Sequence, residues 1–483
     1  MRKILIVLGL CSVISMSVSA NGLLTNSNQS AAYVRMICRL ASLDIDGVYY
    51  NPAGLTKLLH DGFHASINTQ TVFQTRIITS DLDIINNKEH KGSMAIPIFP
   101  SVYAVYKKGD WAFSFGFNPV AGGGKVDFKN GIPSLEIKAA ALPSTLSNAG
   151  IPTTNYAVNM QFKGSSVYYG AQFNATYQIN ENFSAAFGVR GVYAANAYEG
   201  YMRDIMINPQ QPMFNPSGGL MSAPEFFTAA ANAYQAMGNP AMAAQMSAYA
   251  SATSDKYADV TQSGFGIAPI IGLNFNYQNL NIGARYEFKT RMETKNKTTV
   301  DGTGLFPDGK TQRVDVPAYF TIGASYKVSP KLNVAAGFGY YGDKQAKMHS
   351  WDPEVKNDPN NPMDLGNYVR REDFINNGCQ EYSLGLEYNI TEKFLVSAGY
   401  QYGKVGVQPE YQSDINHTIN NHTYGFGGQY KISENIKLNA GFLITKYVPF
   451  DVQMQHPLVA SQKYTQTYDR RNYDFSVGID IKF

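Results

Sequence analysis

The chain has 483 residues, of which only 16% are charged, and it is rich in glycine (43), tyrosine (33) and phenylalanine (27). This composition is typical of strands that alternate glycine and aromatic residues, and it predicts an all-β fold. Without Arg2 and Lys3, which belong to a predicted export signal, 38 basic residues remain beside 37 acidic ones. A chain so close to neutral argues against nucleic acid or an acidic surface as the main partner.

Residues 1–20 have the features of a signal peptide. Arg2 and Lys3 precede an apolar run over residues 4–14, and small residues follow up to Ala20. The run is shorter than the roughly 20 apolar residues of a membrane-spanning helix, and no second long apolar run follows it. An exported membrane protein without such helices has to be a closed barrel, since only closure leaves no unpaired backbone in lipid. We therefore expect a protein of the bacterial outer membrane.

Residues 21–61 precede the first strand, which we expect to start near Gly62, and they show no strand pattern of their own. Polar backbone is tolerated inside a barrel lumen but not in lipid. We predict that this segment folds into the lumen as a hatch, or plug. Its candidate functional residues are Asp44, Asp46, Asn51, Pro52 and Ala53.

Residues 62–483 show regular alternation of strands, short turns and longer connections, which predicts a transmembrane antiparallel β-barrel of 14 strands. The six short turns centre on Gly109, Glu181, Gln278, Pro330, Glu392 and Glu434. The longer connections cover residues 80–93, 129–163, 204–260, 299–313, 348–377, 410–420 and 451–465. The last strand, residues 473–483, alternates at every position and ends on Phe483, a pattern that resembles clients of the bacterial barrel-assembly machinery. A soluble propeller or sandwich is the alternative, but it does not require long loops on one side and short turns on the other.

The third strand is expected to lose its pairing part of the way along. A strong strand pattern over residues 111–117 runs into Asn118, Pro119, Gly122, Gly123 and Gly124. Proline cannot donate to a ladder, and glycines offer no side chains to seal a wall. The alternative is that the strand simply ends there on the extracellular side.

The long extracellular loop at residues 204–260 is predicted to contain a helical hairpin. Two Ala/Met-rich stretches, 224–237 and 240–253, each begin with proline and are separated by Gly238 and Asn239. Its apolar residues Phe226, Phe227, Met237, Met242 and Met246 either capture a hydrophobic ligand or pack on neighbouring loops as a cap. The sequence leaves both uses open.

Two arginines are expected to point into the lumen. Arg190 and Arg285 occupy the alternate positions of their strands that face the lumen, where they can meet the carboxylate of a fatty acid. Glu287 and Asp315 have the same parity and can instead neutralise them.

The Asn51-Pro52-Ala53 motif between an export signal and a first barrel strand resembles the hatch of the FadL/OmpP1/TodX family of transporters of hydrophobic compounds. The resemblance implies a 14-stranded barrel with an N-terminal plug, in agreement with the strand count. It also implies uptake of long-chain fatty acids or other hydrophobic small molecules through loop capture, internal binding and hatch rearrangement. In such a transporter the break at Asn118, Pro119, Gly122, Gly123 and Gly124 would be a lateral opening toward the membrane.

We therefore expect a monomeric outer-membrane diffusion channel without enzymatic activity, cofactor or metal ion. Its expected partners are a hydrophobic small-molecule ligand, the lipid and lipopolysaccharide of the outer membrane, and the barrel-assembly machinery, with no nucleic acid. Two alternatives remain: a general porin, or a surface adhesin or structural barrel.

Overall fold

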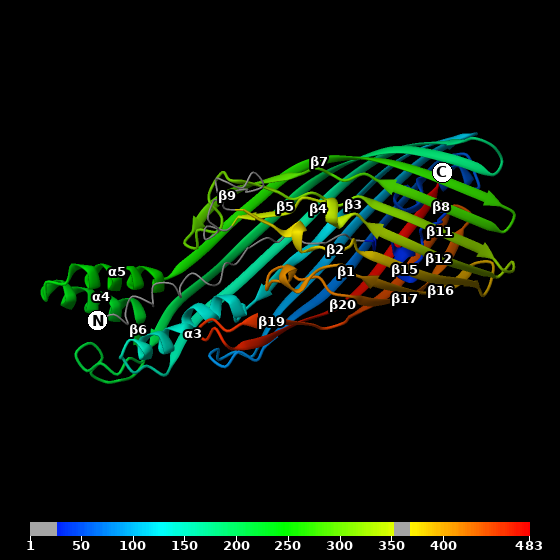
Figure 1. The fold of residues 1–483 in the computed structure, drawn as a ribbon. Helices are drawn as coiled ribbons and strands as arrows, with labels where there is room; N and C mark the ends of the chain where they lie inside the picture. Colours follow the sequence, from blue (N-terminus) through cyan, green and yellow to red (C-terminus); the bar gives the residue numbers. More distant parts are fainter. Residues whose placement is uncertain (1–26, 352–367) are drawn as a thin grey trace.

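The computed structural model describes residues 27–351 and 368–483, and the predicted signal peptide lies outside these ranges. Most of the described residues belong to long antiparallel strands that close into a barrel (Figure 1). The wall consists of β1 (Gly62–Ser80), β2 (Glu89–Lys108), β3 (Trp111–Phe128), β4 (Tyr156–Gln178), β5 (Phe183–Ile207), β7 (Lys256–Tyr277), β8 (Leu280–Glu287), β9 (Glu293–Asp301), β10 (Thr311–Arg313), β11 (Tyr319–Lys327), β12 (Leu332–Tyr341), β15 (Gln380–Asn389), β16 (Phe394–Lys404), β17 (Asn421–Ser433), β18 (Ile436–Tyr447), β19 (Phe450–Gln455) and β20 (Lys463–Lys482). No helix among the described residues is long and apolar enough to span a bilayer.

The barrel closes because β1 pairs with β2 on one edge and with β20 on the other. Three of the wall strands are interrupted, so that β8 with β9, β10 with β11, and β18 with β19 each act as one strand of the wall. Counted in this way, 14 strands form the closed ring, which confirms the predicted fold.

All six predicted short turns are confirmed, and they lie together at one end of the barrel (Figure 1). The long connections lie at the opposite end. The predicted helical hairpin is present there as α4 (Ala223–Ala236) and α5 (Pro240–Thr253), after the short strand β6 (Met221–Ser222). A third helix, α3 (Pro133–Asn148), was not predicted. The connection between β12 and β15 adds the short hairpin strands β13 (His349–Trp351) and β14 (Tyr368–Arg370).

Alternation within the strands places apolar side chains outside and polar ones inside. In β8 the polar residues Asn281, Arg285 and Glu287 are buried toward the lumen. In β20 the outward Phe475 and Val477 are more than half exposed, as suits contact with lipid. Between the predicted connection 299–313 and the predicted turn at Pro330, the sequence implies one strand over residues 314–328, but the regular strand β11 begins only at Tyr319. The first part of this stretch leaves the ladder at Asp315, a buried carboxylate that binds Arg313 at 2.7 Å.

The loops at the extracellular end pack into a cap with its own apolar core. Ile85 of the first connection, Ile137 of α3, Phe226 of α4 and Tyr464 of β20 belong to one buried cluster. Figure 1 shows α3, α4 and α5 beyond the same end of the barrel. The cap therefore joins segments that are far apart in the sequence.

Glu136 of α3 fastens the connection between β1 and β2 to this cap. The carboxylate is buried and accepts hydrogen bonds from the backbone of Asn86 at 2.9 Å and from the Tyr156 hydroxyl at 2.7 Å. His90 Nε2 lies 3.2 Å from its other oxygen. Burial opposes ionisation of Glu136, but the hydrogen bonds from His90, Tyr156 and Asn87 outweigh it and lower its pKa from 4.5 to about 2.

Because the pKa of Glu136 is lower in the folded protein, its ionised form stabilises the cap above pH 4.5, and this contribution is lost as the pH falls toward about 2. We expect the hydrogen-exchange protection of residues 81–88, measured relative to the intrinsic exchange rate at each pH, to fall over that pH interval. In Glu136→Gln the protection of these residues should already be low at neutral pH and should depend little on pH. The exposed Glu225→Gln in α4 is the matched control. Equal behaviour of the two variants would contradict this account.

Candidate functional site

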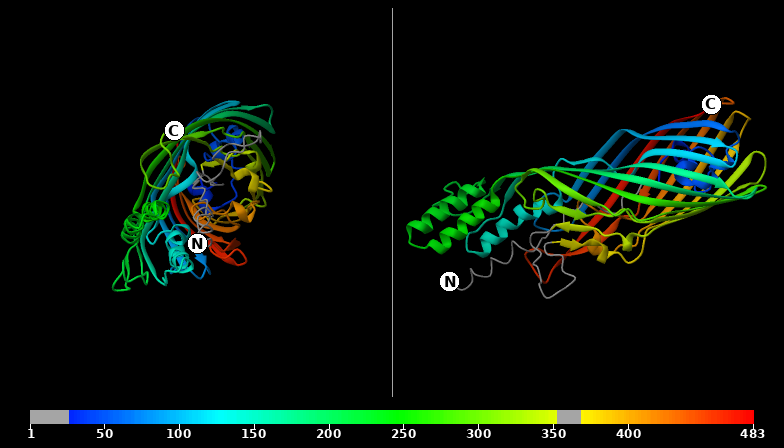
Figure 2. Two further views of the ribbon diagram at one scale, coloured as in Figure 1. Left: turned by 60° about the vertical axis from the view of Figure 1, so that its left-hand side comes forward. Right: turned by 90° about the horizontal axis from the view of Figure 1, so that it is seen from above.

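The N-terminal residues 27–61, which we call the plug, lie inside the barrel (Figure 2). They contain α1 (Ala31–Arg35), α2 (Gly47–Tyr50) and the 3-10 helix η2 (Pro52–Lys57). Nearly all plug residues from Gln29 to Thr56 are buried. Ser30 begins α1 as its N-cap, because its hydroxyl accepts a hydrogen bond from the backbone of Tyr33 at 3.0 Å.

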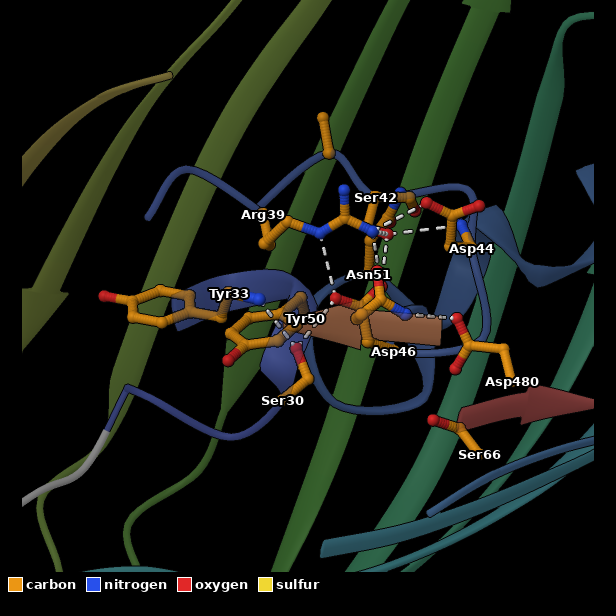
Figure 3. Close-up of polar contacts among 12 residues, drawn as sticks. Ser30, Tyr33, Arg39, Ser42, Asp44, Asp46, Tyr50, Asn51, Ser66 and Asp480 are labelled. Carbon is orange, nitrogen blue, oxygen red and sulfur yellow. Dashed lines mark hydrogen bonds and ion pairs between the residues drawn. The ribbon is translucent and has the colours of Figure 1, made fainter. Parts of the chain in front are cut away.

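Asp46 is the polar centre of the plug (Figure 3). Its carboxylate accepts hydrogen bonds from Nη2 and Nε of Arg39 at 2.8 and 2.9 Å. The hydroxyls of Ser42 and Ser30 add hydrogen bonds of 2.5 and 3.1 Å. Asp46 thus joins the start of α1 to the loop that leads into α2, and both charges of the Arg39–Asp46 pair are buried.

Ion pairs also connect the plug to the wall. Arg35 lies 2.6 Å from Glu387 of β15. Asp44 binds Arg39 at 2.7 Å and lies 3.9 Å from Lys437 of β18. Burial would raise the pKa of Asp44, but Lys437 and Arg39 outweigh it and hold the pKa well below its usual range. The plug is therefore attached to β15 and β18 by charge as well as by packing.

The predicted hatch motif lies against the opposite part of the wall. Asn51 donates to Asn274 of β7 at 2.8 Å, and the carbonyls of Pro52 and Ala53 accept hydrogen bonds from Thr176 of β4 and Ser184 of β5. These contacts fix the motif between three wall strands. Asp44 and Asp46 therefore share Arg39 as a partner, whereas Asn51 contacts the wall.

Glycines on the lumen face of the wall allow the plug to pack so closely. A Cβ at Gly283 would lie 2.8 Å from Asn51 Cγ, and one at Gly323 would lie 2.6 Å from Leu40 Cβ. Side chains at such positions would overlap the plug. Other wall glycines that approach the plug in the same way are Gly337, Gly385, Gly399, Gly425, Gly427, Gly441 and Gly478.

Arg190 and Arg285, predicted to meet a ligand carboxylate, are occupied by other partners. Arg190 Nη1 lies 2.6 Å from both oxygens of Glu287. Arg285 donates to the carbonyl of Tyr49, and both guanidinium groups lie over the Tyr49 ring, at 4.9 and 4.7 Å. This geometry agrees with the alternative prediction, in which Glu287 neutralises the positive charge of these arginines. Asp315, by contrast, binds Arg313 and not these two arginines.

The predicted break in the third strand affects one of its two edges. On the β4 side, β3 stays paired through two register shifts. On the β2 side, pairing stops after Val102 with Phe117 and resumes only at Ser93 with Asp127. We call residues 94–101 of β2 and 118–126 of β3 the seam.

Sequence reasoning missed the contribution of β2 to the seam. Pro97 and Pro100 of β2 lack the backbone donor, as does Pro119 of β3. Gly122 has a positive φ of 84°, and a Cβ there would lie 2.1 Å from the Ser166 carbonyl, so that only glycine fits this bend. Pro97 and Pro100 were the feature of the sequence that could have indicated the loss of pairing in β2.

Gln29 of the plug is a second residue that sequence reasoning missed. Its side chain donates to the carbonyl of Pro119 at 2.7 Å and accepts from Asn118 at 2.8 Å. Its own carbonyl accepts from the hydroxyls of Ser101 and Tyr103 of β2, at 2.6 and 2.7 Å. One buried plug residue therefore binds both strands at the seam.

A lumen cavity of about 200 Å³ reaches the seam from inside. Its lining includes Met94, Ile96, Gly122 and Gly123 of the seam strands, together with Tyr33 of the plug. The plug thus forms part of the cavity wall, and the seam forms another part.

The predicted capture residues of the hairpin are mostly inside the cap. Phe226 and Phe227 are fully buried, and Phe227 packs on Tyr249 with ring centroids 5.3 Å apart. Met246 packs against the same cluster, Met242 is partly buried, and Met237 is 67% exposed. The two phenylalanines therefore pack within the cap, which is the second of the two uses predicted for the hairpin.

A separate cleft of about 390 Å³ lies among other loops of the cap. Ile137, Phe374, Met454 and Tyr464 give it apolar walls. Ile415 also lines this cleft, and its carbonyl accepts a hydrogen bond from Arg76 on the lumen side at 3.2 Å. The cleft and the lumen cavity are therefore neighbours.

A closed barrel with lipid-compatible outer positions and an internal plug defines an outer-membrane β-barrel protein. The profile of the family described as outer membrane protein transport protein (OMPP1/FadL/TodX) matches residues 11–483, and the chain belongs to this family. Its members share the fold of an outer-membrane channel for hydrophobic compounds.

Solved structures with the same fold include a Pseudomonas aeruginosa FadL homologue, with 11% identity and a TM-score of 0.64 over 96% of this chain and 100% of that one. The P. putida toluene transporter TodX shows 16% identity and a TM-score of 0.55, over 91% and 94% of the two chains. The Ralstonia pickettii toluene transporter TbuX shows 15% identity and a TM-score of 0.52 with the same coverage. No curated protein sequence matches this chain.

We expect Asp46→Asn to loosen the plug much more than Asp44→Asn. Loss of one partner of a buried ion pair leaves the other charge uncompensated and costs about 3–5 kcal/mol. The side chain of Asp44 is 46% exposed, so its loss should cost about 1 kcal/mol or less. Native-state hydrogen exchange of the α1 amides measures both. An equal or larger effect of Asp44→Asn would contradict the central place given to Asp46.

Proposed function

We propose that this protein takes up long-chain fatty acids or similar hydrophobic small molecules by diffusion and releases them sideways at the seam. The ligand binds at the extracellular loops, enters the lumen cavity, and leaves between β2 and β3 when the plug rearranges. The observation that carries this proposal is the continuity of the cavity with the seam through Met94, Ile96, Gly122 and Gly123.

The seam is suited to opening because little backbone pairing has to be broken there. Gly123 and Gly124 of β3 face the side chains of Met94 and Ile96, which fill the gap in place of a ladder. Methionine is flexible and unbranched, and such a side chain can move aside for a ligand of variable shape. Passage through the seam therefore needs a change of side-chain packing more than a change of fold.

Gln29 supports a coupling between the plug and the seam. Any displacement of the plug that moves Gln29 breaks the hydrogen bonds between Gln29 and both strands of the seam. The partners lost are Asn118 and the Pro119 carbonyl on β3, and Ser101 and Tyr103 on β2. Movement of the plug would thus loosen the two strands where they are already unpaired. The Asn51-Pro52-Ala53 motif, fixed on β4, β5 and β7, would be the part that stays in place.

For loop capture the cleft is better suited than the helical hairpin. Its apolar walls are accessible, whereas Phe226 and Phe227 are covered by the cap. Residue Ile415 lies between the cleft and the cavity, so a ligand would pass the loop that contains it. A general porin would need an open lumen, and the buried plug counts against one.

The lateral route predicts that a covalent link across the seam stops uptake. A Cβ at Gly124 would lie 2.5 Å from Ile96 Cγ1, so cysteines at positions 96 and 124 are within reach of a disulfide. In a protein with Cys38 and Cys379 replaced by serine, oxidation of the pair Ile96→Cys and Gly124→Cys should reduce fatty-acid uptake at least about tenfold, and a reductant should restore it. Uptake of radiolabelled oleate by cells with equal surface expression measures the effect.

The control is a second pair in the fully paired part of the same two strands. Val105 and Ser114 are register partners, so Val105→Cys with Ser114→Cys should cross-link without loss of uptake. Undiminished uptake after complete oxidation of the seam pair would refute lateral exit.

A further inference from the structure

The lumen cavity contains two arginines that face each other across the strands that close the barrel. Arg76 of β1 and Arg470 of β20 are register partners, so their side chains leave the wall at directly opposite positions. Both line the cavity, and Arg470 is 7% exposed. Like charges directly opposite each other in a sheet are destabilising. An anion bound between the two guanidinium groups would offset this repulsion.

Neither arginine has an acidic partner among the described residues. Arg76 binds Gln74 Oε1 at 3.2 Å and the Ile415 carbonyl at 3.2 Å. Arg470 binds the His417 carbonyl at 2.8 Å and lies over the ring of Tyr447, and its Nε has no hydrogen-bond partner in the described part of the chain. A buried guanidinium with a free donor is a strong site for a carboxylate.

The carboxylate of Asp414, in the loop that contacts both arginines, has other partners. Asp414 accepts hydrogen bonds from the backbone of Ser134 at 2.8 Å and from Gln466 at 2.6 Å. The carbonyls of Ile415 and His417 in the same loop hold the two guanidinium groups from above. The loop therefore orients the arginines but does not neutralise them.

The rest of the cavity is arranged by polarity. Two carboxylates also line the cavity, and each has a partner of its own. Asp474, four residues along β20 and thus about 13 Å from Arg470, binds Asn28 of the plug at 3.0 Å. Glu381 accepts a hydrogen bond from the Tyr319 hydroxyl at 2.8 Å. On the neighbouring strand β2, Met94 and Ile96 are apolar and lead from β1 to the glycines of β3. Going around the wall, the cavity changes from guanidinium to apolar side chains and then to the seam.

We infer that Arg76 and Arg470 bind the anionic head of an amphiphile, a carboxylate on an apolar chain, and that they select acids over neutral molecules of the same size. The inference rests on the proposed function for the cavity as a ligand site. With the head at the arginines, the apolar chain lies along Met94 and Ile96, which line the same cavity. The chain end thus reaches the seam first, and the ligand enters the membrane tail first.

The test compares an acid with its neutral analogue on purified protein in nanodiscs. Radiolabelled dodecanoate and 1-dodecanol are titrated at neutral pH, with binding to empty nanodiscs subtracted. We expect Arg470→Gln and Arg76→Gln each to weaken dodecanoate binding by about tenfold or more, since each removes a hydrogen bond between charged groups. Binding of 1-dodecanol should not change.

Arg471→Gln is the matched control, because Arg471 is exposed on the outer face of the same strand and carries the same charge. It should leave both affinities unchanged. If Arg470→Gln fails to assemble, the partly exposed Arg76→Gln provides the same comparison. Unchanged dodecanoate affinity in the arginine variants, or an equal loss for acid and alcohol, would overturn the inference. Failure of the seam cross-link to stop uptake would refute lateral exit but leave this acid preference intact.

Discussion

Lipid offers no hydrogen-bond partner, so every backbone N–H and C=O group of a barrel wall must be paired within the wall. Among the described residues, the seam is where neighbouring wall strands lose this pairing over the longest run. Pro97, Pro100 and Pro119 remove donors there, and the glycines of β3 let the side chains of β2 close the gap. The barrel thus combines a complete ring with one edge that is held mainly by side-chain packing.

The plug depends on the same wall in a different way. Lumen-facing glycines allow its backbone to approach the strands, and the Arg39–Asp46 pair holds its own segments together. Gln29 then connects the plug to both strands of the seam. A change in the plug would therefore be transmitted to the seam through four hydrogen bonds and not through the barrel as a whole.

The barrel, its strand count and its short turns could be predicted because alternation and turn residues are local properties of the sequence. The break at Pro119 was found for the same reason. The partners of Arg190 and Arg285 could not be predicted, because parity gives the face of a strand but not which side chains meet across the lumen. The pairing of Arg76 with Arg470 depends on the register between β1 and β20, which lie at opposite ends of the barrel sequence. The high glycine content could be read from the sequence, but the reason for glycine at the lumen-facing positions, close packing of the plug on the wall, is seen only in the structure.

Distance measurement across the seam tests the lateral route most directly. Spin labels at Ile98 of β2 and Lys125 of β3, both exposed, report the separation of the two strands through the dipolar broadening of their continuous-wave electron paramagnetic resonance spectra, which resolves the short distances between neighbouring strands. The account predicts that dodecanoate adds a population with a longer distance, while labels at Tyr106 and Phe113, which are register partners in the paired part of these strands, stay unchanged. An identical distance distribution with and without saturating dodecanoate would contradict it.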